Sequence, residues 1–128
     1  MAVIKRFEDI EAWQKARILT REIYRVSAQG EFARDFGLRD QIRRAGVSSM
    51  SNIAEGFERE GNREFIQFLS VAKGSTAEIK SQLYVALDAA FITQPQFDHI
   101  YHLADDAGNL MGGFMRYLRT APYRGRKF

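Results

Sequence analysis

The chain has 128 residues and a mass of 14.7 kDa, which suits one domain built around a single core. Hydrophobic residues make up 45% and charged residues 27%, a balance typical of a soluble globular protein and not of a disordered one. Cysteine is absent, which excludes disulfides, thiolate nucleophiles and zinc–thiolate sites. The sequence shows neither a run of ~18 apolar residues nor a signal-peptide pattern. We therefore expect a cytoplasmic protein that does not attach to membranes.

The net charge of +3 is unevenly distributed along the chain. Five basic residues and no acidic residue follow position 115. The first 115 residues hold the other 14 basic residues and all 16 acidic ones, which gives that part a net charge of −2. The composition therefore argues against one broad basic face and draws attention to the C-terminal end.

A first helix is predicted to begin near Asp9, an acceptable N-cap, and to end before Gly30. Its apolar residues follow helical spacings of three and four. They are Ala12, Ala16, Leu19, Ile23 and Val26.

A second helix is predicted over residues 36–59, and it carries two stripes. The stripe expected to face the interior consists of Leu38, Ile42, Ala45, Ser49, Ile53 and Gly56. The other, expected to contact a second subunit, consists of Val47, Met50, Ala54 and Phe57. Glycines and serines between them predict close approach of neighbouring backbones, because each helical glycine costs about 1 kcal/mol that packing must offset. The alternative is a frayed or kinked second helix with Phe57 under a loop.

Two further helices follow. Gly61 is placed to end the second helix and Asn62 to cap the third, and Thr93 is placed to cap the fourth. The third helix has the most regular stripe: Phe65, Leu69, Ala72, Thr76, Ile79, Leu83, Ala86 and Ala90. The stripe of the fourth is Phe97, Ile100, Ala104, Ala107, Met111, Phe114 and Leu118. Together these patterns predict an all-α, left-handed, up-down-up-down four-helix bundle over residues 1–121, followed by a short basic tail, 122–128.

Two sets of basic residues are candidates for binding nucleic acid. Arg43 is expected beside the second stripe, one turn from Arg39, while Arg44 points elsewhere; both could contact phosphates or instead pair with Asp35, Asp40 or another subunit. The C-terminal set is Arg116, Arg119, Arg124, Arg126 and Lys127. Tyrosines among these residues could stack on bases, although cations also favour a helix C-terminus.

The remaining polar motifs predict structure and not chemistry. Asn52, in the element that also contains Glu55, is expected to bond a polar group of another helix such as Ser75 or Thr76. His99 and His102 lie on a polar face without ligands from a second helix, so no metal site is expected. No nucleophile, paired acid or phosphate-binding loop is found. We therefore expect no catalytic residue, no cofactor and no enzymatic activity.

Three segments resemble a known family, the small four-helix-bundle proteins encoded within intervening sequences of bacterial 23S ribosomal RNA genes. They are "FEDIEAWQKA", "QIRRAGVSSMSNIAEGFERE" and "REFIQFLSVAKGSTAEIKSQLYVAL". The second helix of that family usually contains an isoleucine–proline pair where this chain has Ser49 and Met50.

This resemblance implies a left-handed up-and-down bundle that assembles as a ring, typically a homopentamer. It also implies relatives that assist reverse transcriptases in diversity-generating retroelements, where the ring holds RNA or DNA. The expected function is therefore a non-catalytic, homo-oligomeric scaffold that binds RNA or DNA, or an RNA-containing complex that includes a protein such as a reverse transcriptase. The alternative is an oligomeric protein-interaction module without a nucleic-acid role.

Overall fold

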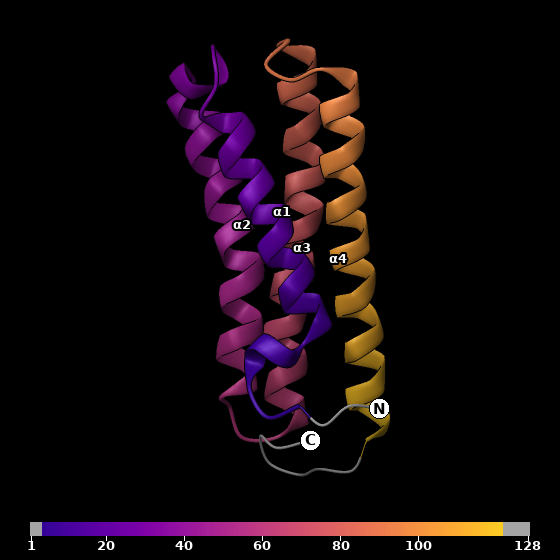
Figure 1. The fold of residues 1–128 in the computed structure, drawn as a ribbon. Coiled ribbons are helices and arrows are strands. Elements are labelled where there is room, and N and C mark those ends of the chain that lie inside the picture. Colours follow the sequence, from indigo (N-terminus) through magenta and orange to yellow (C-terminus); the bar gives the residue numbers. More distant parts are fainter. Residues whose placement is uncertain (1–3, 122–128) are drawn as a thin grey trace.

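The chain folds into four long helices in an up-and-down bundle (Figure 1). The structure is a computed structural model that describes residues 4–121, and within this range it contains no strand. The helices are α1 (Glu11–Ser27), α2 (Phe36–Phe57), α3 (Asn62–Asp88) and α4 (Gln94–Thr120). Two short 3₁₀ helices, η1 (Phe7–Asp9) and η2 (Phe32–Arg34), precede α1 and α2. The predicted all-α four-helix fold is confirmed, while the left hand of the bundle stays a prediction.

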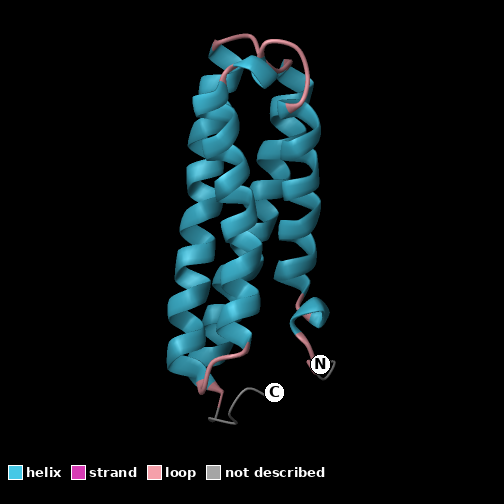
Figure 2. Cartoon of the chain, turned by 90° about the vertical axis from the view of Figure 1, so that its left-hand side faces the viewer, coloured by secondary structure: helices cyan, strands magenta, loops and turns pink. Residues whose placement is uncertain are grey.

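Each helix packs against its neighbours in the chain, and α4 returns to pack against α1. The start of α1, the turn between α2 and α3, and the end of α4 lie at one end of the bundle, which we call the lower end (Figures 1 and 2). The connections 28–35 and 89–93 lie at the other, upper end. The lower half of the α3–α4 hairpin therefore consists of the first turns of α3 and the last turns of α4.

The predicted interior stripes are buried almost as expected. Every predicted residue of α1 is buried, and in α3 only Ala90 is not. Ala90 lies beyond the end of α3 in a left-handed conformation, with φ 62°. In the other two helices Leu38 and Phe114 are half-buried and the remaining stripe residues are buried. The 3.6-residue periodicity therefore located the core of each helix correctly.

The glycines of α2 are explained by contacts within the chain. A Cβ atom at Gly56 would lie 2.7 Å from Phe68 Cβ, so α3 requires glycine there. At Gly46 it would lie 3.1 Å from Thr20 Oγ1, the hydroxyl of which donates to the Gly46 carbonyl at 2.9 Å. The helix is continuous from residue 36 to 57. The predicted close approach is correct, and its partners are α1 and α3.

Two predicted N-caps are wrong. Asp9 ends η1, and its carboxylate accepts hydrogen bonds from the backbone N–H groups of Lys5 and Arg6 at 3.1 and 3.3 Å. Helix α1 instead starts after Ile10, which has no capping side chain. Asn62 is the first residue of α3, capped by Gly61 with φ 82°. The predicted caps failed because both polar side chains bond to groups outside the helix they were assigned to.

The other two predicted helix starts are supported by side-chain caps. Thr93 caps α4 as predicted, with Gln96 completing a capping box. Asp35 caps α2 by accepting a hydrogen bond from the Leu38 N–H at 3.0 Å. Each cap satisfies backbone donors that a helix leaves without partners in its first turn.

Candidate nucleic-acid interface

Four basic side chains gather on the lower half of the α3–α4 face. Lys73 and Arg116 meet over Gly112, where an added Cβ atom would lie 3.2 Å from Lys73 Cε and 3.6 Å from Arg116 Nη1. Arg63, in the first turn of α3, and Arg119, in the last turn of α4, line one groove between the two helices. All four residues are exposed. We call Arg63, Lys73, Arg116 and Arg119 the basic patch.

The four cations of the basic patch have no carboxylate partner in the described range. None of its four residues forms an ion pair with a carboxylate of residues 4–121. Glu64 is the single acidic residue that α3 and α4 contribute over residues 62–73 and 109–121. Because neither an ion pair nor burial occupies these charges, they are available to an anionic ligand in solvent.

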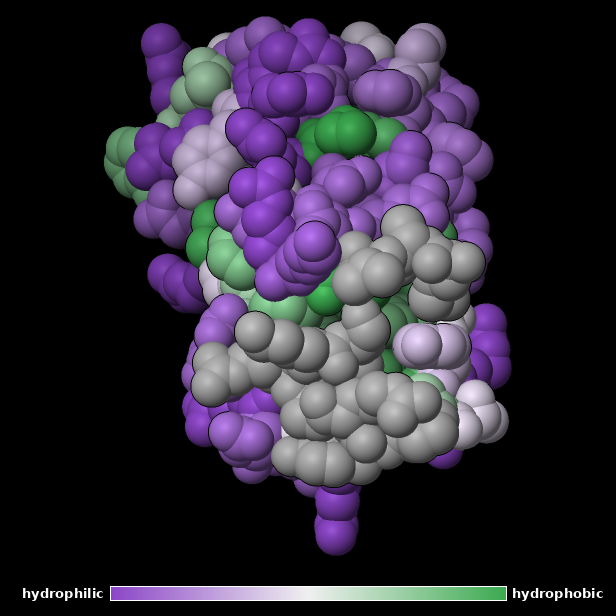
Figure 3. Space-filling view, turned by 60° about the horizontal axis from the view of Figure 1, so that its bottom comes forward, coloured by the Kyte–Doolittle hydropathy of each residue, from purple (hydrophilic) through white to green (hydrophobic). Residues whose placement is uncertain are grey.

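The groove beside the patch has a volume of about 530 Å³. Its lining comes from the beginning of α3 and the end of α4: Asn62, Arg63, Ile66, Gln67, Leu118, Arg119 and Ala121. Figure 3 looks toward the lower end of the molecule, where hydrophobic surface is visible between hydrophilic side chains. The lining of the groove therefore combines the apolar residues Ile66 and Leu118 with two arginines, one from each helix.

Asn62 holds the two walls of this groove together. Its Nδ2 donates hydrogen bonds to the carbonyls of Leu118 and Ala121 at 3.0 and 3.2 Å. These carbonyls belong to the end of α4, where backbone acceptors lack partners inside the helix. Asn62 is 9% exposed, and its Oδ1 has no hydrogen-bond donor among residues 4–121.

The C-terminal candidates divide into two groups. Arg116 and Arg119 lie in the basic patch, whereas Arg124, Arg126 and Lys127 lie outside the described residues. The sequence analysis missed Arg63 and Lys73 because it counted charge along the chain and not by helix face. In an up-and-down bundle the start of α3 must lie beside the end of α4, so the topology could have identified both residues.

Arg43 and Arg44 lie on the other hairpin and not in the patch. Arg43 is half-buried against α1, with Nε donating to Ser27 Oγ at 2.8 Å and the guanidinium 4.5 Å from the Tyr24 ring centroid. Arg44 is exposed. Neither pairs with Asp35 or Asp40; Asp40 pairs with Arg39 at 3.1 Å. Arg43 therefore stabilises the α1–α2 contact, and Arg44 remains a solvent-facing cation.

The predicted interface stripe of α2 is divided between core and surface. Phe57 is 4% exposed and packs edge-on against Phe65, with ring centroids 6.3 Å apart. Met50 packs on the same core cluster. Val47 is exposed and Ala54 half-buried. Phe57 is thus a core residue of the single chain, because the lower end of the bundle, including η1 and α1, already covers this side of α2.

The serines and Asn52 form a chain of hydrogen bonds from α2 to α3. Asn52 Nδ2 donates to the carbonyl and to Oγ of Ser48, both at 2.9 Å. Ser75 Oγ then donates to Ser48 Oγ at 3.0 Å. The prediction that Asn52 bonds another helix directly is wrong, because Ser48 stands between it and Ser75.

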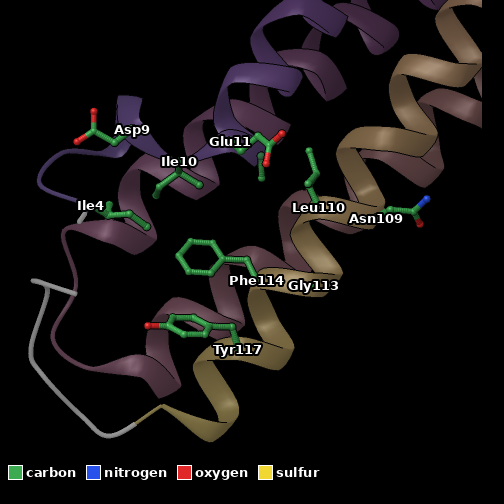
Figure 4. Close-up of a pocket in the computed structure, with 10 residues that line it drawn as sticks. Ile4, Asp9, Ile10, Glu11, Asn109, Leu110, Gly113, Phe114 and Tyr117 are labelled. Atoms are coloured by element: carbon green, nitrogen blue, oxygen red, sulfur yellow. The ribbon is translucent and has the colours of Figure 1, made fainter. Parts of the chain in front are cut away.

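The histidines and the larger grooves show no catalytic arrangement among residues 4–121. His102 lies 3.3 Å from Asp106 on its own helix, and His99 lies 3.9 Å from Glu22. No three potential metal ligands gather within the described range. A second groove, of about 400 Å³, lies between the start of α1 and the end of α4 (Figure 4). The side chains of Ile4, Ile10, Leu110, Phe114 and Tyr117 make its lining largely apolar.

Asp9 is an ionisable residue that lines this second groove. The backbone N–H of Lys5 holds the pKa of the Asp9 carboxyl below its usual value, with smaller contributions from Arg6. This carboxylate is therefore ionised and already hydrogen-bonded, which suits a structural role and not general acid catalysis.

The helices of the described part do not combine the length and hydrophobicity that a membrane span requires.

Comparison with known proteins identifies the family. No curated protein matches the chain. A crystal structure from Bacteroides thetaiotaomicron, described as a protein of unknown function from the S23 ribosomal protein family, has the same fold. It aligns with a TM-score of 0.75 and 21% identity over 82% of this chain and 98% of its own. The family model described as 23S rRNA-intervening sequence protein matches residues 8–113. The chain therefore belongs to the family of 23S rRNA-intervening sequence proteins.

Proposed function

We propose that this protein is a non-catalytic, homo-oligomeric scaffold that binds RNA through the basic patch. The observation that carries the proposal is the convergence of four exposed, unpaired cations from α3 and α4 on one face. Cations of this kind bind phosphates without regard to sequence and release counterions as they do so. A nucleic-acid phosphate backbone therefore suits the patch, and RNA is the form that we propose.

A ring of subunits would repeat the patch around its circumference. Each patch by itself offers only a few phosphate contacts, which give weak and salt-sensitive binding. When several patches engage one RNA, the second and later contacts become intramolecular, and the overall affinity exceeds that of one subunit. We propose a pentamer, as the family resemblance implies, and a cytoplasmic location.

The outer α2–α3 face supplies a surface for this assembly. Val47, on α2, is 44% exposed, and Val71 and Val85, on α3, are 54% and 53% exposed. Gly74 lies in the middle of α3, and an added Cβ atom there would have no neighbour within 4 Å. A glycine that costs the helix about 1 kcal/mol without any packing reason inside the chain suits close approach by another subunit. The proposed interface therefore keeps Val47 and replaces Phe57 by residues of α3.

The RNA proposal is tested by neutralising the patch. Fluorescence anisotropy of a labelled RNA is measured from 50 to 200 mM salt, a range over which phosphate contacts change affinity strongly. Replacing all four patch residues by Gln should reduce the slope of log affinity against log salt by about 3, since each single-strand contact contributes about 0.7. The matched control replaces four exposed or half-buried cations of the N-terminal region by Gln: Lys5, Lys15, Arg17 and Arg21.

An equal loss in both variants would show that net charge and not the patch determines binding. If the native protein binds no RNA, the exposed valines of the α2–α3 face favour the second candidate function, a protein-interaction module. Light scattering on a sizing column tests assembly separately. Val71→Asp should lower the mass toward the 14.7 kDa of one chain, whereas Asn109→Asp, on α4, should not. Unchanged mass for Val71→Asp would exclude the α2–α3 face as the interface.

A further inference from the structure

The groove at the lower end of the α3–α4 hairpin has features that simple phosphate binding does not require. Its apolar floor is formed by the half-buried side chain of Ile66, above Leu118, which is 1% exposed, and Arg63 and Arg119 line it from the two helices. Gln67 adds an exposed primary amide. A surface that only neutralised phosphates would need the cations but not the apolar floor or the amide.

We infer that this groove binds one unpaired nucleotide of a single-stranded RNA, an inference that rests on the proposed function. An unstacked base presents two flat π-faces, which pack favourably on aliphatic side chains and on the planes of arginine guanidinium groups. Its edges carry donors and acceptors, and the Gln67 amide offers one group of each kind. A base inside a duplex exposes neither its faces nor its pairing edge, so the groove selects single strands.

The walls of the groove are fixed before any ligand arrives. Asn62 joins the first residue of α3 to the carbonyls of Leu118 and Ala121, which sets the separation of the two helices at this point. Since the protein does not have to order the groove upon binding, less binding free energy is lost. Asn62 Oδ1 is itself buried and lacks a donor among residues 4–121, so Asn62 acts by holding the two walls and not by contacting the ligand.

Size and position agree with this ligand. The volume of about 530 Å³ lies within the range of small-ligand sites, roughly 300–1,000 Å³. Arg63 and Lys73 are ten residues apart on α3, which corresponds to about 15 Å along the helix. A strand held in the groove would therefore pass over the rest of the patch within a few nucleotides.

The test separates base recognition from charge. The double variant Arg63→Lys, Arg119→Lys keeps both charges but removes both guanidinium planes. We expect its affinity for a 12-nucleotide single-stranded oligouridine to fall about tenfold, the scale of one lost base-stacking contact. Its affinity for a blunt RNA duplex of equal length and its salt slope should not change. The control is Arg17→Lys, Arg21→Lys, on α1, which should alter neither affinity.

The possible outcomes distinguish the two proposals. If the double variant binds single strands as tightly as the native protein while the four-Gln patch variant loses affinity, the groove inference is wrong and the scaffold proposal stands. Equal losses of affinity for single strands and duplexes would mean that the two arginines contact phosphates and not a base, which also overturns the inference. If the native protein binds neither RNA, the scaffold proposal fails. Thermal melts by circular dichroism confirm that each variant is folded.

Discussion

The lower and upper halves of the α3–α4 face are built from the same two helices but carry opposite charges. Residues 62–73 and 109–121 contain four basic residues and one acidic residue, whereas residues 74–88 and 94–108 contain one basic residue and five acidic ones. The single cation above, Lys80, is bound to Asp105 at 2.7 Å. The four cations below have no such partner within the described range.

The aromatic residues of the two halves differ in how far they are exposed to solvent. Below, Phe65 is 1% exposed and meets Phe114 edge-on at 5.3 Å. Above, Tyr84 is 52% exposed and lies 4.8 Å from Phe97. The Lys80–Asp105 ion pair and the ring contacts in both halves stabilise the bundle. Cations left unpaired on one face are available for binding, and only the lower half has them. Within the α3–α4 face, the comparison teaches that the lack of an ion-pair partner separates the lower cations from Lys80.

The largest effect should follow from removing the lower aromatic contact. Phe65→Ala should reduce the free energy of unfolding by about 3–5 kcal/mol, because it leaves a cavity in the core. Tyr84→Ala, in the upper half, should cost only about 1 kcal/mol, because half of that ring already faces solvent. Urea denaturation followed by circular dichroism measures both values. Similar costs would show that the two aromatic clusters stabilise the bundle equally.

Removing an upper carboxylate should make the two halves more alike. Asp105→Asn frees Lys80 and removes a negative charge from the face, so we expect RNA to bind about three- to tenfold more tightly at 50 mM salt. Glu55→Gln is the matched control, since it frees Arg59 from an ion pair at 2.8 Å on α2. Anisotropy titrations compare the two variants. An equal gain in both would contradict a binding site confined to the α3–α4 face.

A smaller effect should distinguish two adjacent glycines of α4. Gly112→Ala places a methyl group 3.2 Å from Lys73 Cε and should displace that side chain, lowering RNA affinity about two- to threefold. Gly113→Ala makes only ordinary contact with Arg116, at 3.7 Å, and should leave affinity unchanged. Both should raise the melting temperature slightly, because alanine favours helix. If Gly112→Ala binds RNA normally, the position of Lys73 is unimportant.

The smallest effect concerns pH and the upper half. The side-chain hydrogen bond from Lys80 lowers the pKa of Asp105 from 3.8, and the same bond raises the pKa of Lys80 from 10.5. The pair therefore contributes fully between these values; the contribution declines as pH falls below about 3.8 or rises above about 10.5. The melting-temperature difference between the native protein and Lys80→Gln should be constant from pH 5 to 9 and shrink at pH 3. For Lys15→Gln we expect no such change.

The fold could be predicted from the sequence because it depends on periodicity. The apolar stripes of α1 and α3 are so regular that they predicted the buried residues correctly. The start of α4 was predicted correctly because the Thr93 cap depends only on neighbouring residues. Asn62 was misassigned because its partners, 56 and 59 residues away, are set by tertiary packing. Phe57 was misassigned because a second apolar stripe cannot reveal whether another subunit or the same chain covers it. The basic patch was missed because its residues come from two helices that lie side by side, whereas charges were counted along the sequence.

The bond between Asn62 and the end of α4 has a thermodynamic consequence. The last turn of a helix is ordinarily the first part to fray, and here one side chain holds it against α3. Fraying of α4 would separate the walls of the groove, so ligand binding and closure of this turn are linked equilibria. A ligand that binds only the closed groove therefore stabilises the final turn of α4 against fraying. Amide hydrogen exchange in that turn should slow by the same factor as the ligand shifts the equilibrium toward the closed state.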